Sequence, residues 1–246
     1  MEQLEQYLFP QTAQPQSFLA DHEDVLLQLR QALGHLISTA ATAEETEALL
    51  LRWQAQLAPL VKDLLADAQF MLEKDPAAQN LAEIINTYPG FKAILYYRVA
   101  HWFCQHKLPL LPRLITEIAH TLTGIDIHPG ATIAVPFCID HGTGVVIGQT
   151  AQIGPRCTLY QGVTLGAASV KKELARQKRH PTLEADVVVY ANATILGGDT
   201  LIGQGCIIGG NTWVTQSVPA HHLVLTVAQH NIVTKPIGHE PYNFVI

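Results

Sequence analysis

Basic residues are few in this sequence. Its 246 residues hold 15 Lys and Arg against 21 Asp and Glu, which gives a formal net charge of −6. Nucleic-acid binding depends on clustered Lys and Arg, so nucleic acid is not an expected partner. No stretch approaches the ~18 consecutive apolar residues of a membrane span, and the acidic start lacks the apolar core of a secretion signal. We expect a cytoplasmic protein that does not associate with membranes.

Cysteine is also scarce. Cys104, Cys138, Cys157 and Cys206 lie far apart in the sequence, and none belongs to a CxxC pair. This spacing is typical of buried thiols in a reducing compartment and does not favour a disulfide framework or a zinc site.

Apolar residues recur at helical spacing in the first half of the chain. One apolar stripe lies within residues 25–36 and another within residues 49–64. Asp75 and Pro76 are typical of a further helix start, with Asp75 as the N-cap and Pro76 at the first helical position, where its missing N–H costs nothing.

The segment Tyr88-Pro89-Gly90 is expected to break that helix. Two more helices are predicted at about residues 91–105 and 112–122, and Gly124 is expected to end the helical half. The sequence thus predicts an all-helical N-terminal unit.

Beyond Gly124 the apolar period changes to six. This period suits neither an α-helix nor an alternating strand, and it is the signature of hexapeptide repeats, in which each short strand forms one wall of a triangular β-helix. A β-sandwich is the alternative, but its strands recur about every 8–12 residues. The residues that carry the period are Ile127, Ile133, Ile139, Ile147, Ile153, Leu159, Leu165, Val189, Ile195, Ile202, Ile208 and Val214.

The period breaks in two places, and a coil that departs from a solenoid repeat extrudes residues from the wall. The first break is the eight-residue step across residues 139–147, which contains His141. The second is the aperiodic, basic stretch of residues 166–181, which contains Arg179 and His180. We expect the functional residues at these breaks.

An ordered set of motifs closely resembles the serine O-acetyltransferase family of hexapeptide-repeat acyltransferases. The resemblance covers about residues 70–235 and reaches into the helical half. The motifs that carry it are Asp75-Pro76-Ala77, Gly90-Phe91, Tyr97-Arg98-Val99-Ala100-His101-Trp102, Asp126-Ile127-His128-Pro129-Gly130, Asp140-His141-Gly142-Thr143-Gly144, Gly162-Val163-Thr164-Leu165-Gly166 and Arg179-His180-Pro181.

This resemblance implies an α+β chain: an N-terminal helical oligomerisation domain (1–123), a left-handed parallel β-helix acetyltransferase domain (124–235) and a flexible tail (236–246). It implies a homotrimer or a dimer of trimers. The implied reaction transfers the acetyl group of acetyl-CoA to the hydroxyl of L-serine, giving O-acetyl-L-serine and CoA, the first step of cysteine biosynthesis from serine.

His141 is the expected general base, because a positioned histidine is the usual group that takes a proton from an alcohol. The resemblance makes Asp126 the carboxylate that orients His141. The two are 15 residues apart, close to one coil, so we expect them to stack. The alternative is that His141 caps a turn and Asp126 bonds backbone amides.

Free serine requires carboxylates for its amino group and a cation for its carboxylate, and Arg179 can bind a carboxylate bidentately. The resemblance assigns Asp75 and Asp140 to the serine pocket, with His180 beside Arg179. Nearby Lys171, Lys172 and Lys178 either form a solvated loop or meet the phosphates of coenzyme A.

By family position, Gly166, Ala191 and Gly210 lie along the pantetheine arm of acetyl-CoA, where small residues let the backbone approach. Backbone donors would stabilise the oxyanion, and no metal is needed. His128, His141 and His180 also suggest the metal-dependent β-helix enzymes of the carbonic anhydrase type, but His180 sits on the basic loop and not on a regular wall.

The chain departs from the family pattern at three places. Gln149 replaces the usual glutamate, residues 167–178 replace a Gly-rich segment, and residues 227–229 alter a late turn. Two alternative functions therefore stay open. The chain is an acetyltransferase that acts on another small hydroxy amino acid, or it is a catalytically inactive trimeric scaffold subunit.

The sequence ends in Ile246. Family members often end in isoleucine and insert it into the active site of O-acetylserine sulfhydrylase, whose site binds an amino-acid carboxylate. The resemblance therefore implies that enzyme as a partner; the alternative is that the end of the tail packs on the β-helix.

Overall fold

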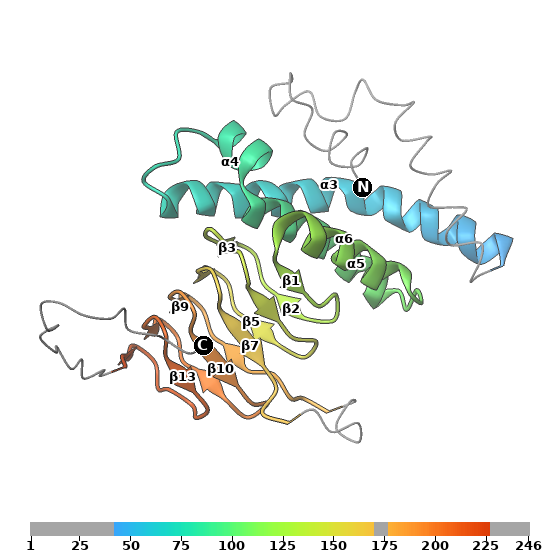
Figure 1. Ribbon diagram of the computed structural model, residues 1–246. Coiled ribbons are helices and arrows are strands. Elements are labelled where there is room, and N and C mark those ends of the chain that lie inside the picture. Colours follow the sequence, from blue (N-terminus) through green and yellow to red (C-terminus); the bar gives the residue numbers. More distant parts are fainter. Residues whose placement is uncertain (1–41, 170–176, 227–246) are drawn as a thin grey trace, which may run out of the picture.

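A layer of helices lies across one end of a triangular parallel β-helix in the computed structural model, which describes residues 42–169 and 177–226 (Figure 1). The stripe predicted within residues 25–36 and the tail that ends in Ile246 lie outside the described residues. The helices are α3 (Ala43–Lys74), α4 (Leu81–Thr87), α5 (Pro89–Gln105) and α6 (Leu111–Thr123).

Helix α3 has 32 residues and is the longest of the described helices. It begins with a capping box, in which the Thr42 hydroxyl accepts a hydrogen bond from the Glu45 amide and the Glu45 carboxylate accepts one from the Thr42 amide. The predicted apolar stripe is its buried face, as shown by Trp53 and Leu64, which are 5% and 0% exposed.

Asp75 is not a helix N-cap, so that prediction is wrong. Asp75 ends α3, where its backbone N–H bonds the Met71 carbonyl, and the next helix starts only at Leu81, capped by Asn80. The predicted break at Tyr88-Pro89-Gly90 is confirmed, because α4 ends at Thr87 with Tyr88 as its C-cap. Pro89 then opens α5 at the first turn, where a proline costs no hydrogen bond.

The last two helices begin and end within two residues of the predicted positions. Gly124 ends α6 in the left-handed conformation, with φ of 69°. This conformation suits glycine because it has no Cβ. The first strand follows two residues later.

The β-helix has three parallel sheets, here called A, B and C. Sheet A has the order β1-β4-β7-β10-β13, sheet B has β11-β8-β5-β2 and sheet C has β14-β12-β9-β6-β3. The strands are β1 (Asp126–Ile127), β2 (Thr132–Ile133), β3 (Phe137–Ile139), β4 (Val146–Ile147), β5 (Gln152–Ile153), β6 (Cys157–Leu159), β7 (Thr164–Gly166), β8 (Thr182–Leu183), β9 (Val188–Val189), β10 (Thr194–Leu196), β11 (Leu201–Ile202), β12 (Ile207–Ile208), β13 (Trp213–Val214) and β14 (Leu223–Val224).

Each residue of the predicted six-residue period points into the prism, and none is more than 7% exposed. In-register stacking explains this pattern: Ile127 pairs with Ile147, and Ile147 pairs with Leu165. The sequence analysis missed Leu183, which lies six residues before Val189 and resumes the period after the basic stretch.

A buried ion pair joins the helices to the first coil. Arg98 on α5 donates from Nε and Nη2 to the two carboxylate oxygens of Asp67 on α3, at 2.6 and 2.8 Å. The Asp67 carboxylate also accepts from the backbone amide of Phe137 on β3, at 2.8 Å. Arg98 further donates to the carbonyls of Ile133 and Ala134.

Gly90 lets α5 approach the same coil. A Cβ at this position would lie 2.1 Å from the Ile139 carbonyl oxygen, so no larger residue fits without a backbone shift. Helix α5 therefore starts directly against β3. Within residues 42–169 and 177–226, no helix is both long and apolar enough to cross a membrane.

Arg98→Met is expected to lower the free energy of unfolding by roughly 3–5 kcal/mol, because it leaves the Asp67 carboxylate buried without its partner. The double variant Asp67→Leu, Arg98→Met should recover much of this loss, since neither charge then remains buried. Urea unfolding measures both, with the exposed Arg52→Met on α3 as control. A cost for Arg98→Met no larger than that of the control would contradict this role.

Candidate active site

The predicted site residues gather along two edges of the prism, one on each side of sheet A. The His141 edge consists of the turns from sheet C to sheet A, at residues 140–145, 160–163, 190–193 and 209–212. The Arg179 edge consists of the connections from sheet A to sheet B, with the described residues 128–131, 148–151, 167–169, 177–181 and 197–200.

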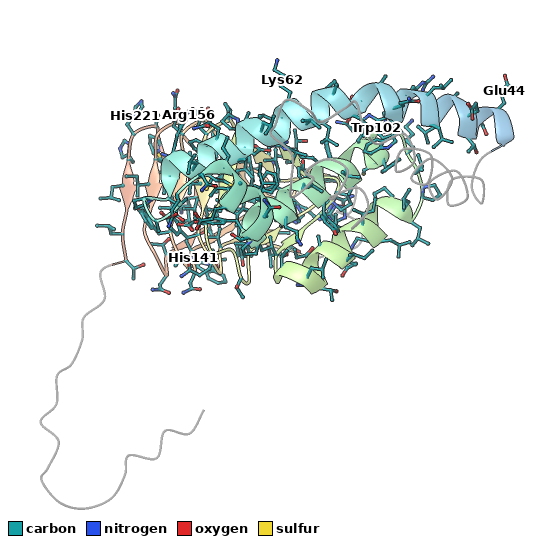
Figure 2. The ribbon with its side chains drawn as sticks, turned by 90° about the horizontal axis from the view of Figure 1, so that it is seen from above. Glu44, Lys62, Trp102, His141, Arg156 and His221 are labelled. Carbon is teal, nitrogen blue, oxygen red and sulfur yellow. The ribbon has the colours of Figure 1, made fainter. Side chains whose placement is uncertain are left out.

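His141 stands on the extruded turn that the lengthened repeat predicted. Its φ is 57°, a left-handed conformation unusual for a residue with a side chain, and its side chain is 71% exposed. Nδ1 lies 3.9 Å from the nearer carboxylate oxygen of Asp140. In Figure 2, His141 lies on one side of the molecule, with Arg156 and His221 on the other.

Asp75 belongs to the same cluster through Tyr88. The Tyr88 hydroxyl donates to the Asp75 carboxylate at 2.5 Å, and the Ala77 amide donates to the other carboxylate oxygen at 2.8 Å. These hydrogen bonds, with a smaller contribution from His141, lower the pKa of Asp75. The same bond raises the pKa of Tyr88 to about 12. Asp75 is thus held ionised near His141.

Two further predicted positions stack on this edge. Gly210 lies close enough to the Ala191 carbonyl that a Cβ would be 3.1 Å from its oxygen, and the Asn211 amide donates to that carbonyl. Beside them the rings of Tyr160 and Tyr190 stack at 4.9 Å between centroids. The third small residue, Gly166, ends β7 at the other side of sheet A.

On the Arg179 edge, His180 is only 8% exposed. Its ring lies over Gly148, where a Cβ would be 1.9 Å from Cδ2, so this position accepts only glycine. Burial, followed by the charges of Arg179 and Lys178 and by His128, lowers the pKa of His180 to about 4. The imidazole is therefore neutral at physiological pH.

Arg179 is oriented by Gln149. The guanidinium Nη2 donates to the Gln149 side-chain oxygen at 2.5 Å. Lys178 folds back along the edge, where its ammonium donates to the carbonyls of Thr150, at 3.0 Å, and His180. Lys178 therefore braces the edge, whereas Lys171 and Lys172 lie outside the described residues.

Asp126 does not stack on His141, so that expectation is wrong within one chain. The lengthened first coil pairs Asp126 with Val146, which is 20 residues further along. Asp126 instead lies 3.5 Å from the Arg113 guanidinium on α6, and its charge acts on His128 at the Arg179 edge. Among the described residues, no hydrogen bond or ion pair joins Asp126 to His141.

A single chain thus brings Asp75, Asp140 and His141 together at one edge and Arg179 and His180 together at the other. Sequence reasoning missed two polar residues that organise these clusters. Tyr88 was interpreted only as part of a helix break, and Thr150 follows Gln149 without having been considered. In the part of the chain that the structure describes, no group of three His, Cys, Asp or Glu residues could hold a metal ion.

Comparison with known proteins gives one consistent result, although no family model matches. Two serine acetyltransferases of Synechococcus elongatus are 46% and 43% identical to this chain over 206 and 182 residues. The alignments cover 78% and 74% of this chain, and 64% and 72% of the relatives. The chain thus spans slightly under two thirds of the first relative. A Bacillus subtilis serine acetyltransferase is 42% identical over 170 residues.

The similar solved structures are also serine acetyltransferases. Serine acetyltransferase 1 of Entamoeba histolytica, in complex with L-cysteine, has a TM-score of 0.83 at 34% identity and matches 92% of this chain and 85% of its own. The Neisseria gonorrhoeae serine acetyltransferase, in complex with serine, has a TM-score of 0.66 at 28% identity and matches 92% and 93%.

The parallel β-helix of hexapeptide repeats, together with these relatives, assigns the chain to the hexapeptide-repeat acyltransferases. The helical layer and the sequence identities to the relatives narrow this class to one family. The chain belongs to the serine acetyltransferase family, with the left-handed β-helix of that family.

The low pKa of His180 predicts a pH-dependent stability. The unfolded histidine binds a proton below its ordinary pKa of about 6.5, whereas the folded ring stays neutral down to about 4. The free energy of unfolding should therefore rise with pH across this window and lose that contribution as the pH falls. His180→Gln should flatten this part of the slope, and the exposed His222→Gln serves as the matched substitution. Urea unfolding at several pH values measures it; equal slopes in parent and His180→Gln would contradict the assignment.

Proposed function

We propose that the chain transfers the acetyl group of acetyl-CoA to the hydroxyl of L-serine, in a site that two copies of the chain complete. The observation that carries the proposal is the separation of charge between the edges. Asp75 and Asp140 lie at the His141 edge, and Arg179 lies at the other. An amino acid has one cationic and one anionic end, so carboxylates and a guanidinium together match it.

Recognition of serine follows from these groups. Arg179 binds the acceptor carboxylate, for which the Gln149 contact orients the guanidinium without neutralising it. Asp75, kept ionised by Tyr88, and Asp140 bind the ammonium group. The relatives crystallised with serine or L-cysteine support an acceptor of this size.

His141 acts as general base. Its exposed ring takes the proton from the serine hydroxyl as that oxygen attacks the thioester carbonyl, which forms a tetrahedral oxyanion. Collapse of this intermediate breaks the C–S bond, and His141 returns the proton to the leaving thiolate. The products are O-acetylserine and CoA. One C–O bond has formed, one C–S bond has broken, and the hydroxyl proton has moved to the thiol through His141.

Asp126 orients His141 from the neighbouring copy. It opens β1 on sheet A, where its carboxylate lies 3.5 Å from the Arg113 guanidinium and its charge acts on His128. In a cyclic assembly, the His141 edge of one copy meets the Arg179 edge of the next, because such interfaces join two different surfaces. Asp126, Arg179 and His180 of one chain then face His141 of the other.

An exposed apolar stripe on α6 supports this contact. Leu114, Ile118 and Leu122 are 46–54% exposed, and Arg113 on the same helix contacts Asp126. Contiguous apolar side chains on a surface usually mark an interface. We therefore propose a homotrimer as the smallest active form, and a dimer of trimers is compatible with it.

Acetyl-CoA lies along the same junction. Ala191 and Gly210 stack on the His141 edge and Gly166 on the facing side of sheet A, so their backbones can approach a pantetheine arm from two copies. The four free thiols support a reducing, cytoplasmic location. The domain limits at residues 123 and 235, and the binding of Ile246 to the sulfhydrylase, stay predictions.

Purified protein should release free thiol from acetyl-CoA with L-serine in a panel of hydroxy amino acids. His141→Ala should lower kcat about 10²–10⁴-fold, because general-base catalysis is lost, and should leave the assembly intact. His222→Ala, an exposed histidine away from both edges, is the control. Acetyl transfer to homoserine but not to serine would show that the acceptor is not serine. No transfer to any hydroxy amino acid of the panel would favour the scaffold function.

Mixed assemblies test the shared site. His141→Ala and Arg179→Ala, carrying different tags, should each be nearly inactive alone. A trimer that contains both has one site with both halves intact, so dual-tag purified trimers should recover roughly one third of the parent activity. The same experiment with two tagged copies of His141→Ala should recover none. An inactive mixed trimer would place the whole site within one chain.

A further inference from the structure

Thr150 contacts both predicted site residues of the Arg179 edge, Arg179 and His180. Its hydroxyl oxygen accepts from the backbone amides of Arg179, at 2.9 Å, and His180, at 3.1 Å. The same oxygen lies 2.9 Å from His180 Nδ1, and the Thr150 amide lies 3.2 Å from that nitrogen. Residues 30 positions apart in sequence are thus joined by four short contacts.

Counting donors and acceptors fixes the direction of each bond. A threonine hydroxyl has one proton and two lone pairs. The two amides occupy the lone pairs, so the hydroxyl proton must point to His180 Nδ1. The Thr150 amide is also a donor. Because Nδ1 faces two donors, it carries no proton, and the neutral imidazole must carry its proton on Nε2.

We propose that Thr150 is a positioning residue that fixes His180 as the tautomer protonated at Nε2, so that the ring donates a hydrogen bond to an oxygen of the acceptor substrate. This proposal rests on the proposed function, in which His180 faces the serine site. It assigns the hydroxyl of Thr150 a part in the reaction without contact to the substrate.

The surroundings of the ring support a neutral donor. No hydrogen bond within the described residues occupies Nε2, whereas Nδ1 faces two donors. Burial and the neighbouring Arg179 and Lys178 charges oppose a second proton, which is why the pKa of His180 is low. Lys178 also donates to the Thr150 carbonyl, so the backbone of Thr150 is braced independently of its hydroxyl.

Thr150→Val removes the hydroxyl and keeps the branched shape, whereas Thr150→Ser keeps the hydroxyl. We expect Thr150→Val to lower kcat/KM for serine about 10–100-fold, as substitution of a group that orients a functional histidine commonly does. Its KM for acetyl-CoA should stay within about twofold, and Thr150→Ser should restore most of kcat/KM. Thr132→Val, an exposed threonine on β2, is the matched control.

The tautomer itself is measured by ¹⁵N NMR of the assembled protein labelled at histidine, with His180→Gln to assign the signal. The parent should show Nε2 protonated and Nδ1 unprotonated, and Thr150→Val should show a mixture of tautomers. Thermal unfolding checks that the variants fold; if Thr150→Val does not, Thr150→Ser with the parent tautomer and activity supports the proposal.

Either of two results would overturn the proposal: a proton on Nδ1 in the parent, or a Thr150→Val protein with unchanged tautomer and unchanged kcat/KM. A loss that serine at position 150 fails to restore would also count against it. If the parent transfers no acetyl group to serine, the proposed function fails, whereas the NMR measurement still tests what Thr150 does to the ring.

Discussion

The ion pair between Asp67 and Arg98 is the constraint on which the site depends. It is buried, bidentate and completed by the Phe137 amide, so the geometry of α3, α5 and the first coil is set together. A buried carboxylate tolerates few arrangements, because any loss of a partner leaves a desolvated charge. Asp75 is the C-cap of α3, and its carboxylate interacts electrostatically with His141. The helices therefore place the Asp75 carboxylate near a β-helix turn that belongs to a different part of the sequence.

The β-helix divides its own residues between packing and chemistry. Inward positions such as Leu165 and Ile195 repeat every six residues and fill the prism, so they cannot vary in polarity without opening the core. The residues of the turns do not fill the core, so their polarity can vary. The lengthened step places His141 in a left-handed conformation on the surface, and Gly148 on the opposite edge leaves the space that the His180 ring fills. The turns at the edges can therefore differ in length and conformation while the six-residue apolar repeat inside the prism is kept.

The period of six predicted the walls of the prism because burial forces it, and the breaks predicted where His141, Arg179 and His180 stand. Three features were not predicted correctly from the sequence. Asp75 and Pro76 have the composition of a helix start, but Asp75 follows the end of α3, and its carboxylate accepts from Tyr88 and the Ala77 amide without starting a helix. Stacking of Asp126 on His141 was inferred from an average coil, whereas the extra residues of the first coil shift the register. Thr150 gave no signal, because its role depends on a chain segment 30 residues away.

Charge differs between the two edges in a way that serves both assembly and substrate. The His141 edge presents Asp75 and Asp140, and the Arg179 edge presents Arg179 and Lys178 around an imidazole held neutral. In the proposed ring, the His141 edge of one copy faces the Arg179 edge of the next, and their opposite charges favour this head-to-tail contact over a two-fold one. In the proposed site a zwitterion lies between them, and its two charges take the place of this direct attraction. A glutamate at position 149 would place a carboxylate beside the guanidinium of Arg179, whereas the Gln149 of this chain contacts the guanidinium as a neutral amide.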